Sequence, residues 1–113
     1  LTFDLCPGSG IDDGWSGFDI GPKSVELFRE SIVGTTKLIF NGPMGVFEIP
    51  PFEMGTRGVV DILRDITKEG TITVVGGGDS VAALEMFDET TSVSYVSTGG
   101  GATLELLSGA VLP

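Results

Sequence analysis

Hydrophobic residues gather in two kinds of segment that alternate along the chain. Short apolar runs at 37–40, 71–75 and 93–96 are typical of strands in a parallel sheet, and residues 1–6 form a further short apolar run. Helical spacing follows at 22–34, 52–69 and 80–87, and in a last stretch through Leu107 that Gly109 ends. Strand, turn and helix in this order predict an α/β fold with a parallel sheet whose strands are buried on both faces.

The most regular helical pattern lies at 52–69. Its expected apolar face consists of Phe52, Val59, Ile62, Leu63 and Ile66. Glu53 and Arg57 stand four residues apart, which predicts an ion pair on the helix surface, and Gly70 marks the end of the helix.

Composition narrows the classes of function. The chain has 113 residues, 18 of them glycine, and a formal net charge of −10, and none of its basic residues lies beyond Lys68. A nucleic-acid binder needs a basic surface, so we expect no nucleic-acid partner. The single cysteine excludes an internal disulfide, and the lack of histidine argues against a zinc site.

No apolar run is long enough to span a membrane, and no signal peptide is visible. We therefore expect no membrane-spanning segment. We also expect no second domain within these residues, because neither a repeat nor a linker interrupts the pattern.

Three glycine-containing turns follow the expected strands, at 41–45, 76–80 and 98–102. The carboxyl ends of parallel strands share one edge of a sheet, where ligands collect. Glycine there serves a tight strand-to-helix turn, or lets the backbone approach a phosphate at a helix N-terminus. Two glycine triplets, each between a strand and a helix, favour phosphate binding. Neither triplet completes the P-loop or the Rossmann fingerprint.

Three polar residues near these turns each have two interpretations. Asp79 either caps the helix that follows or binds a magnesium ion beside a phosphate. Ser80 either donates a hydroxyl to a phosphate or only occupies the first helical turn. Glu48 lies in an apolar stretch, where a solvent-facing charge is the simpler interpretation and a sugar diol ligand is the functional one.

The turns themselves carry no lysine or arginine. A helix N-terminus offers only about half a unit charge, and phosphoryl transfer needs cations on the moving group. Either chain outside these residues supplies those cations, or no phosphoryl transfer takes place here.

Four segments together resemble the phosphoglycerate kinase family, in the family's order and spacing. They are GWSGFDIGP at 14–22, NGPMGVFE at 41–48, GGGDSVAA at 76–83 and STGGGATLELL at 97–107. The third segment is similar to the bacterial and plastid branch. The resemblance implies a three-layer Rossmann-like parallel sheet flanked by helices, with residues 1–113 forming part of the carboxyl-terminal, nucleotide-binding domain. It also implies cytoplasm or plastid stroma as the location.

The family transfers a phosphoryl group between 1,3-bisphosphoglycerate and ADP, giving 3-phosphoglycerate and ATP, with Mg²⁺. By resemblance, Glu48 holds the ribose and Asp79 binds the nucleotide's magnesium. The other expected nucleotide-binding residues are Gly17, Asn41, Pro43, Gly45, Gly77, Gly78 and Ser80. Gly100 and Gly101, within the 99–101 triplet, open the helix aimed at the transferring phosphate, which gives them the catalytic role.

Several family features are missing from the sequence. The 3-phosphoglycerate domain, the catalytic arginine and the lysines of the first half of the nucleotide domain are absent, Tyr95 replaces a usual histidine, and Ser16 a usual methionine. Two functions therefore stay open. The chain is the Mg-ADP/ATP half-site of a kinase, or a kinase-derived, non-catalytic structural subunit of a larger assembly. A stand-alone nucleotide-binding module is the weakest alternative, because half a sheet leaves an open edge.

Overall fold

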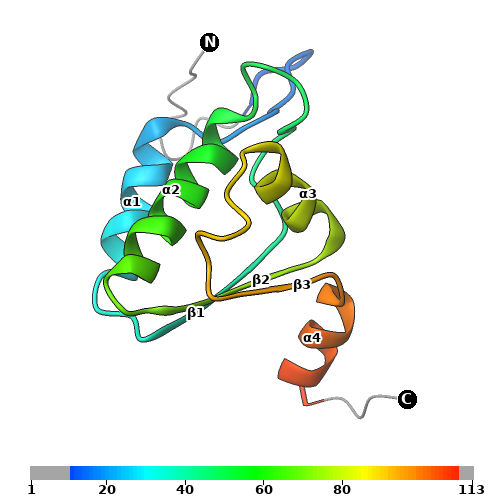
Figure 1. Cartoon of the computed structure of the whole chain (residues 1–113). Helices are drawn as coiled ribbons and strands as arrows, with labels where there is room; N and C mark the ends of the chain where they lie inside the picture. The colour runs from blue at the N-terminus through cyan, green and yellow to red at the C-terminus, as the bar shows by residue number, and fades with distance from the viewer. Residues whose placement is uncertain (1–10, 110–113) are drawn as a thin grey trace.

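Strands and helices alternate along residues 11–109, which the computed structural model describes except for the side chains of residues 102, 103 and 106 (Figure 1). The strands are β1 (Lys37–Asn41), β2 (Ile72–Gly76) and β3 (Tyr95–Ser97). The helices are α1 (Pro22–Ile32), α2 (Met54–Lys68), α3 (Gly78–Met86) and α4 (Gly100–Leu107). The expected α/β class with a parallel sheet and flanking helices is confirmed, and the strand expected at 1–6 lies outside the described residues.

The helix boundaries follow local chemistry. Pro22 is the first residue of α1, where its missing N–H costs nothing. At the end of α2, Gly70 has a φ of 105°. There the N–H of Thr71 donates to the carbonyl of Ile66, and the N–H of Gly70 to that of Thr67. This pair of bonds is the Schellman motif, so the expected stop at Gly70 is confirmed.

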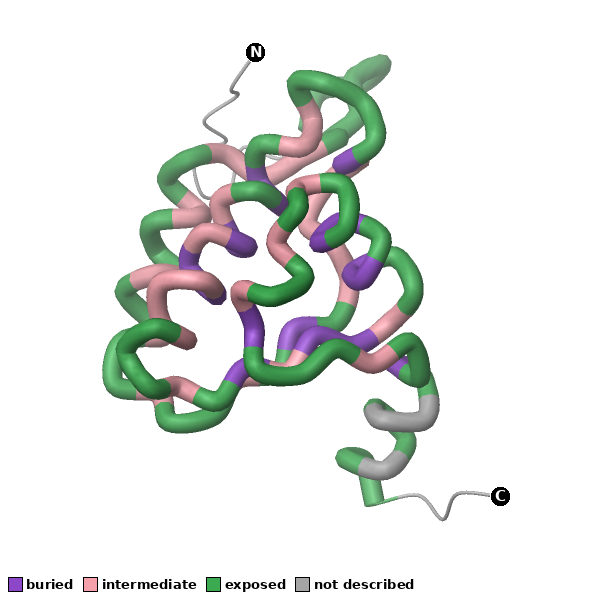
Figure 2. Tube along the Cα trace, in the orientation of Figure 1, coloured by how far each residue is buried: buried purple, intermediate pink, exposed green. Residues whose placement is uncertain are grey.

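The strand order is β1-β2-β3, with both pairs parallel. Crossovers between parallel strands are right-handed, so two successive crossovers in the same direction place α2 and α3 on the same face of the sheet. Their side chains share one core with the strands, made of Phe40, Val59, Val60, Leu63, Val75, Leu84 and Val93. Figure 2 shows buried segments on the helices and on the strands.

The opposite face of the sheet is open among the described residues. Ile39 is 44% exposed and Tyr95 is 65% exposed, and the register places both beside Val74 on one row across the strands. The expectation that residues 37–40 are buried on both faces is therefore wrong. The reason is topological, because both described crossovers lie on the other side and α4 leaves beyond the carboxyl end of β3 (Figure 1).

The expected ion pair on α2 is also absent among the described residues. The guanidinium of Arg57 lies over the ring of Phe87, 4.5 Å from its centroid, and Glu53 Oε2 is buried with no described hydrogen-bond partner. A guanidinium is attracted to the face of an aromatic ring, and the aliphatic part of the arginine side chain packs against that ring. This contact explains why Arg57 turns away from Glu53. The expected apolar face is confirmed, with Val59, Ile62 and Leu63 buried and Phe52 and Ile66 half-buried.

Candidate functional site

The three glycine-containing turns meet at one edge of the sheet. Asn41, Gly76 and Ser97 are the last residues of their strands, and the register places them side by side. The three turns therefore begin next to one another at one edge of the sheet, as expected for parallel strands. Helices α3 and α4 begin within the second and third turns, at Gly78 and Gly100, so both helix N-termini open at this edge (Figure 1).

A side-chain hydroxyl joins the first turn to the second. The backbone N–H of Gly42 donates to Ser80 Oγ at 2.7 Å. Ser80 is 1% exposed, although it belongs to the first turn of α3. The hydroxyl predicted at a phosphate is therefore buried and already engaged with the backbone of a neighbouring turn.

The third turn is held by the other two. Asn41 Nδ2 donates to the carbonyl of Gly100 at 3.2 Å, and the N–H of Gly77 donates to the carbonyl of Ser97 at 3.0 Å. A Cβ at Gly100 would lie 2.5 Å from the nitrogen of Gly77, closer than real Cβ atoms come to any atom. Glycine at position 100 thus permits the close approach of the second and third turns.

The start of α3 shows whether Asp79 caps the helix. The capping position is Gly77, with a φ of 94°, and no side chain caps the helix. Capping by Asp79 is therefore wrong. Asp79 lies in the first turn of α3 and is exposed, where the free N–H groups of the helix favour an anion. Its carboxylate is accessible to a bound cation.

The described residues hold no cluster of three or more acidic, cysteine or histidine side chains able to bind a metal ion. Asp79 alone does not make a magnesium site. It fits a magnesium ion that takes most of its ligands from phosphate oxygens and water, which is the usual state of Mg²⁺ on nucleotides.

Two residues outside the predicted set support the first turn. The buried hydroxyl of Thr56 accepts the N–H groups of Met44 at 3.1 Å and Gly45 at 3.4 Å. Asp19 packs so closely against Gly45 that a Cβ there would overlap its carboxylate. Sequence reasoning missed both residues. The motif at 14–22 contains Asp19, but nothing in spacing indicates that it reaches position 45.

The remaining predicted residues are exposed or half-buried. Pro43 is half-buried, and Glu48 is exposed directly after the buried Phe47. Gly17 is exposed and precedes Phe18, whose carbonyl accepts the N–H of Val46 at 2.9 Å. The segment at Gly17 therefore runs beside the stretch that carries Glu48. Gly78 and Gly101 are exposed, and a Cβ at either would meet no neighbour within 4 Å.

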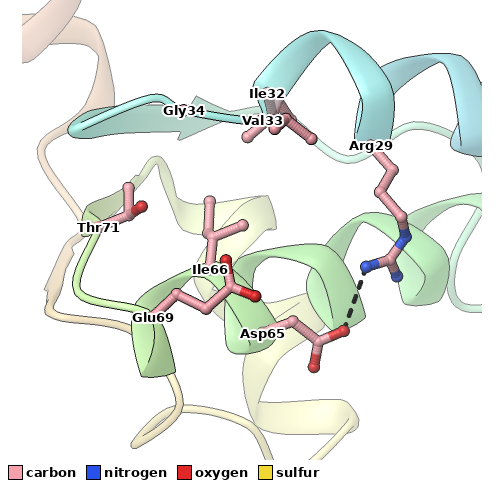
Figure 3. Close-up of a pocket in the computed structure, with 8 residues that line it drawn as sticks. All are labelled: Arg29, Ile32, Val33, Gly34, Asp65, Ile66, Glu69 and Thr71. Atoms are coloured by element: carbon pink, nitrogen blue, oxygen red, sulfur yellow. Dashed lines mark hydrogen bonds and ion pairs between the residues drawn. The ribbon is translucent and has the colours of Figure 1, made fainter.

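A cavity of about 250 Å³ lies at the other end of the sheet. Its lining comes from the carboxyl ends of α1 and α2 and from residues just before β1 and β2, namely Arg29, Ile32, Val33, Gly34, Asp65, Ile66, Glu69 and Thr71 (Figure 3). Arg29 Nη1 pairs with Asp65 Oδ2 at 3.2 Å on its wall. The cavity shares no residue with the three turns, so it is separate from the predicted site.

Comparisons with known proteins agree on one family. Residues 3–110 match the phosphoglycerate kinase family. Phosphoglycerate kinase 1, chloroplastic, of Arabidopsis thaliana is 50% identical over 109 residues, covering 96% of this chain and 23% of the relative. The phosphoglycerate kinase of Nostoc punctiforme is 54% identical over 103 residues, covering 91% of this chain and 26% of the relative.

Solved structures give the same result. The structure of phosphoglycerate kinase from Coxiella burnetii superposes with a TM-score of 0.75 at 42% identity, over 85% of this chain and 24% of that one. The enzyme from Pyrococcus horikoshii superposes with a TM-score of 0.74 at 35% identity, over 88% of this chain and 24% of that one. This chain thus spans about a quarter of the length of the proteins it matches. None of the described helices is long and apolar enough to cross a membrane.

The expected similarity to bacterial and plastid relatives is confirmed by the chloroplast and cyanobacterial matches. The match covers nearly the whole chain in sequence and 85% to 88% of it in the two solved structures. The chain belongs to the phosphoglycerate kinase family.

Proposed function

We propose that this chain supplies the Mg-nucleotide half-site of a phosphoglycerate kinase, with residues 1–113 forming part of its carboxyl-terminal domain. The observation that carries the proposal is the meeting of three glycine-containing turns at one sheet edge, with α3 and α4 opening from it. Backbone N–H groups at two helix N-termini are suited to phosphate oxygens. Relatives from chloroplasts and bacteria support plastid stroma or cytoplasm as its place of action.

Each turn has its own part in this proposal. The N-terminus of α3, with Gly77 and Gly78, faces the nucleotide phosphates, and the exposed carboxylate of Asp79 binds the magnesium ion that accompanies them. Gly100 and Gly101 begin α4, whose N–H groups receive the phosphoryl group in transfer. The nucleoside lies against the first turn, with Asn41, Pro43 and Gly45 beside it, Gly17 at its margin, and Glu48 accepting the ribose hydroxyls.

The reaction that fits this half-site moves one phosphoryl group. A terminal β-phosphate oxygen of ADP forms a new P–O bond to the acyl phosphate of 1,3-bisphosphoglycerate. The bond between that phosphorus and the carboxyl oxygen breaks, and the carboxylate of 3-phosphoglycerate leaves. The 3-phosphoglycerate, and the cations that offset the negative charge of the transfer, belong to parts of a kinase beyond these residues, since the turns contain no lysine or arginine.

The chain alone is therefore expected to bind Mg-ADP weakly and to show no turnover in a coupled ATP-production assay. Titration calorimetry with Mg-ADP tests the half-site directly. Asp79→Asn keeps the shape of the side chain and removes its charge, so binding should weaken about tenfold when Mg²⁺ is present and change little in EDTA. Glu85→Gln is the matched control, because Glu85 is exposed on the same helix but near its carboxyl end.

The second candidate, a non-catalytic structural subunit, is favoured by the open face of the sheet, on which Ile39 and Tyr95 are exposed. A flat titration of the wild-type chain with Mg-ADP would contradict the half-site and favour this alternative. Turnover by the isolated chain would contradict the need for cations from elsewhere.

A further inference from the structure

The hydroxyl of Ser80 occupies the space between two of the glycine-containing turns. Its Oγ accepts the N–H of Gly42 from the first turn at 2.7 Å. It also lies 3.9 Å from the point where a Cβ of Gly77 would stand in the second turn. With the residue 1% exposed, this oxygen contacts protein on several sides.

The Ser80 hydroxyl has one O–H donor and two acceptor lone pairs, and the N–H of Gly42 takes one of the acceptors. The oxygen thereby satisfies a backbone amide that would otherwise lose its partner. Removing a hydrogen-bond partner from a partly buried N–H is costly, so this contact holds Gly42 in one place.

We propose that Ser80 is a positioning residue, which fixes the first turn against the second through Gly42. The proposal rests on the proposed nucleotide function, whose binding surface these two turns form. Ser80 then serves affinity indirectly, because a first turn held in its binding position pays less ordering entropy when the nucleotide arrives.

Two other contacts show that the turns act as a unit. Asn41 connects the first turn to Gly100 of the third, and Gly77 of the second donates to Ser97, the last residue of β3 directly before the third turn. With the Ser80 contact, the first turn is bonded to both others, and the second is bonded to the strand end from which the third begins. Loss of the Ser80 contact should therefore loosen the first turn from the second, while Asn41 still connects the first turn to the third.

Amide hydrogen exchange, measured residue by residue by NMR on the whole chain without nucleotide, tests the contact. In Ser80→Ala we expect the Gly42 amide to exchange at least about tenfold faster, because it loses its acceptor. Ser80→Thr keeps a hydroxyl and should restore slow exchange. Ser97→Ala is the matched control, because its hydroxyl accepts the N–H of Gly99, two residues along the chain, and its loss should leave Gly42 unaffected.

Mg-ADP titration of the same variants completes the test. We expect Ser80→Ala to bind more weakly than wild type, and Ser80→Thr to recover both affinity and slow exchange. Weaker binding with unchanged Gly42 exchange would show that the hydroxyl acts on the phosphate and would overturn the proposal. A Gly42 amide in the wild type that exchanges as fast as a solvent-exposed amide would overturn it without any variant.

The two hypotheses fail in different measurements. If wild-type chain binds no Mg-ADP, the nucleotide function falls, and Gly42 exchange still decides the Ser80 contact. If binding is present and Gly42 exchange does not respond to Ser80→Ala, the positioning role falls alone.

Discussion

Asp19 Oδ2 accepts the backbone N–H of Gly55 at 2.7 Å, across 36 positions of the chain. Its other oxygen accepts the N–H of Ile20 at 2.8 Å. Gly55 is the second residue of α2, so Asp19 satisfies one of the free N–H groups at the start of that helix from a distant part of the chain. The same carboxylate packs against Gly45, which joins the start of α2 to the first turn of the candidate site.

Replacing Asp19 should therefore weaken both the helix start and the turn. We expect Asp19→Ala to lower the free energy of unfolding by about 1–2 kcal/mol, as loss of a cap does. Urea denaturation followed by circular dichroism measures this change. Asp13→Ala is the control, because Asp13 is exposed and should change stability little. Equal stabilities of the two variants would contradict the capping role.

Two neighbouring glycines in α4 should differ sharply in their tolerance of a side chain. A Cβ at Gly100 would lie 2.5 Å from the nitrogen and 2.6 Å from the Cα of Gly77, and both are backbone atoms that cannot move freely. Gly100→Ala should lower the free energy of unfolding by about 1–3 kcal/mol, the usual cost of overpacking. Thermal unfolding of the variant measures this loss.

Gly101→Ala is the matched control for that measurement. Gly101 is exposed, and a Cβ there meets nothing within 4 Å. Alanine is also the better helix former, so this variant should be as stable as wild type or slightly more so. If Gly100→Ala unfolds at the same temperature as Gly101→Ala, the close approach of the second and third turns is wrong.

Glu89 should make stability depend on pH in the acid range. The hydrogen bond from Ser92 lowers the pKa of Glu89 most, burial opposes it, and Arg64 lowers it further, with Nη1 3.1 Å from the carboxylate. A carboxylate with a lowered pKa stabilises the fold fully above its unfolded pKa of about 4.3 and loses that contribution as the pH falls through its folded pKa. Acid should therefore destabilise the chain partly through Glu89.

Ser92→Ala removes the larger cause of that shift, so the variant should lose less stability than wild type between pH 5 and pH 3. Urea midpoints across this range measure the difference. Ser31→Ala is the control, because among the described residues the Ser31 hydroxyl bonds only to the carbonyl of Leu27 within its own helix. Parallel pH profiles for wild type and Ser92→Ala would contradict the role of Ser92.

Much of the fold can be predicted from local patterns in the sequence. The spacing of Val59, Ile62 and Leu63 predicts the buried face of α2, and Gly70 predicts its end, because both depend on neighbours in sequence. The exposure of Ile39 was not predictable in this way. Whether a strand is covered on both faces depends on the direction in which crossovers wind, and an apolar run looks the same in either case.

The candidate site was also predictable only in part. Parallel topology predicted that the three turns would meet, because carboxyl ends of parallel strands share an edge. The contacts of Asp19, Thr56 and Ser80 with those turns were not predictable. They join residues 11 to 38 positions apart, and nothing in the spacing of one segment encodes which backbone amide another segment will reach.

The single direction of winding has a consequence for where a ligand can sit. In a doubly wound sheet the winding reverses at a switch point, and the ligand-binding crevice opens there. β2 lies next to β1, and β3 lies beyond β2 on the same side. Strands of an opposite half would therefore join the edge of β1 that no described strand covers, and the reversal would fall beside it. The turn after Asn41, at the margin of the described sheet, would then stand at the centre of the crevice, with only one wall supplied by these residues.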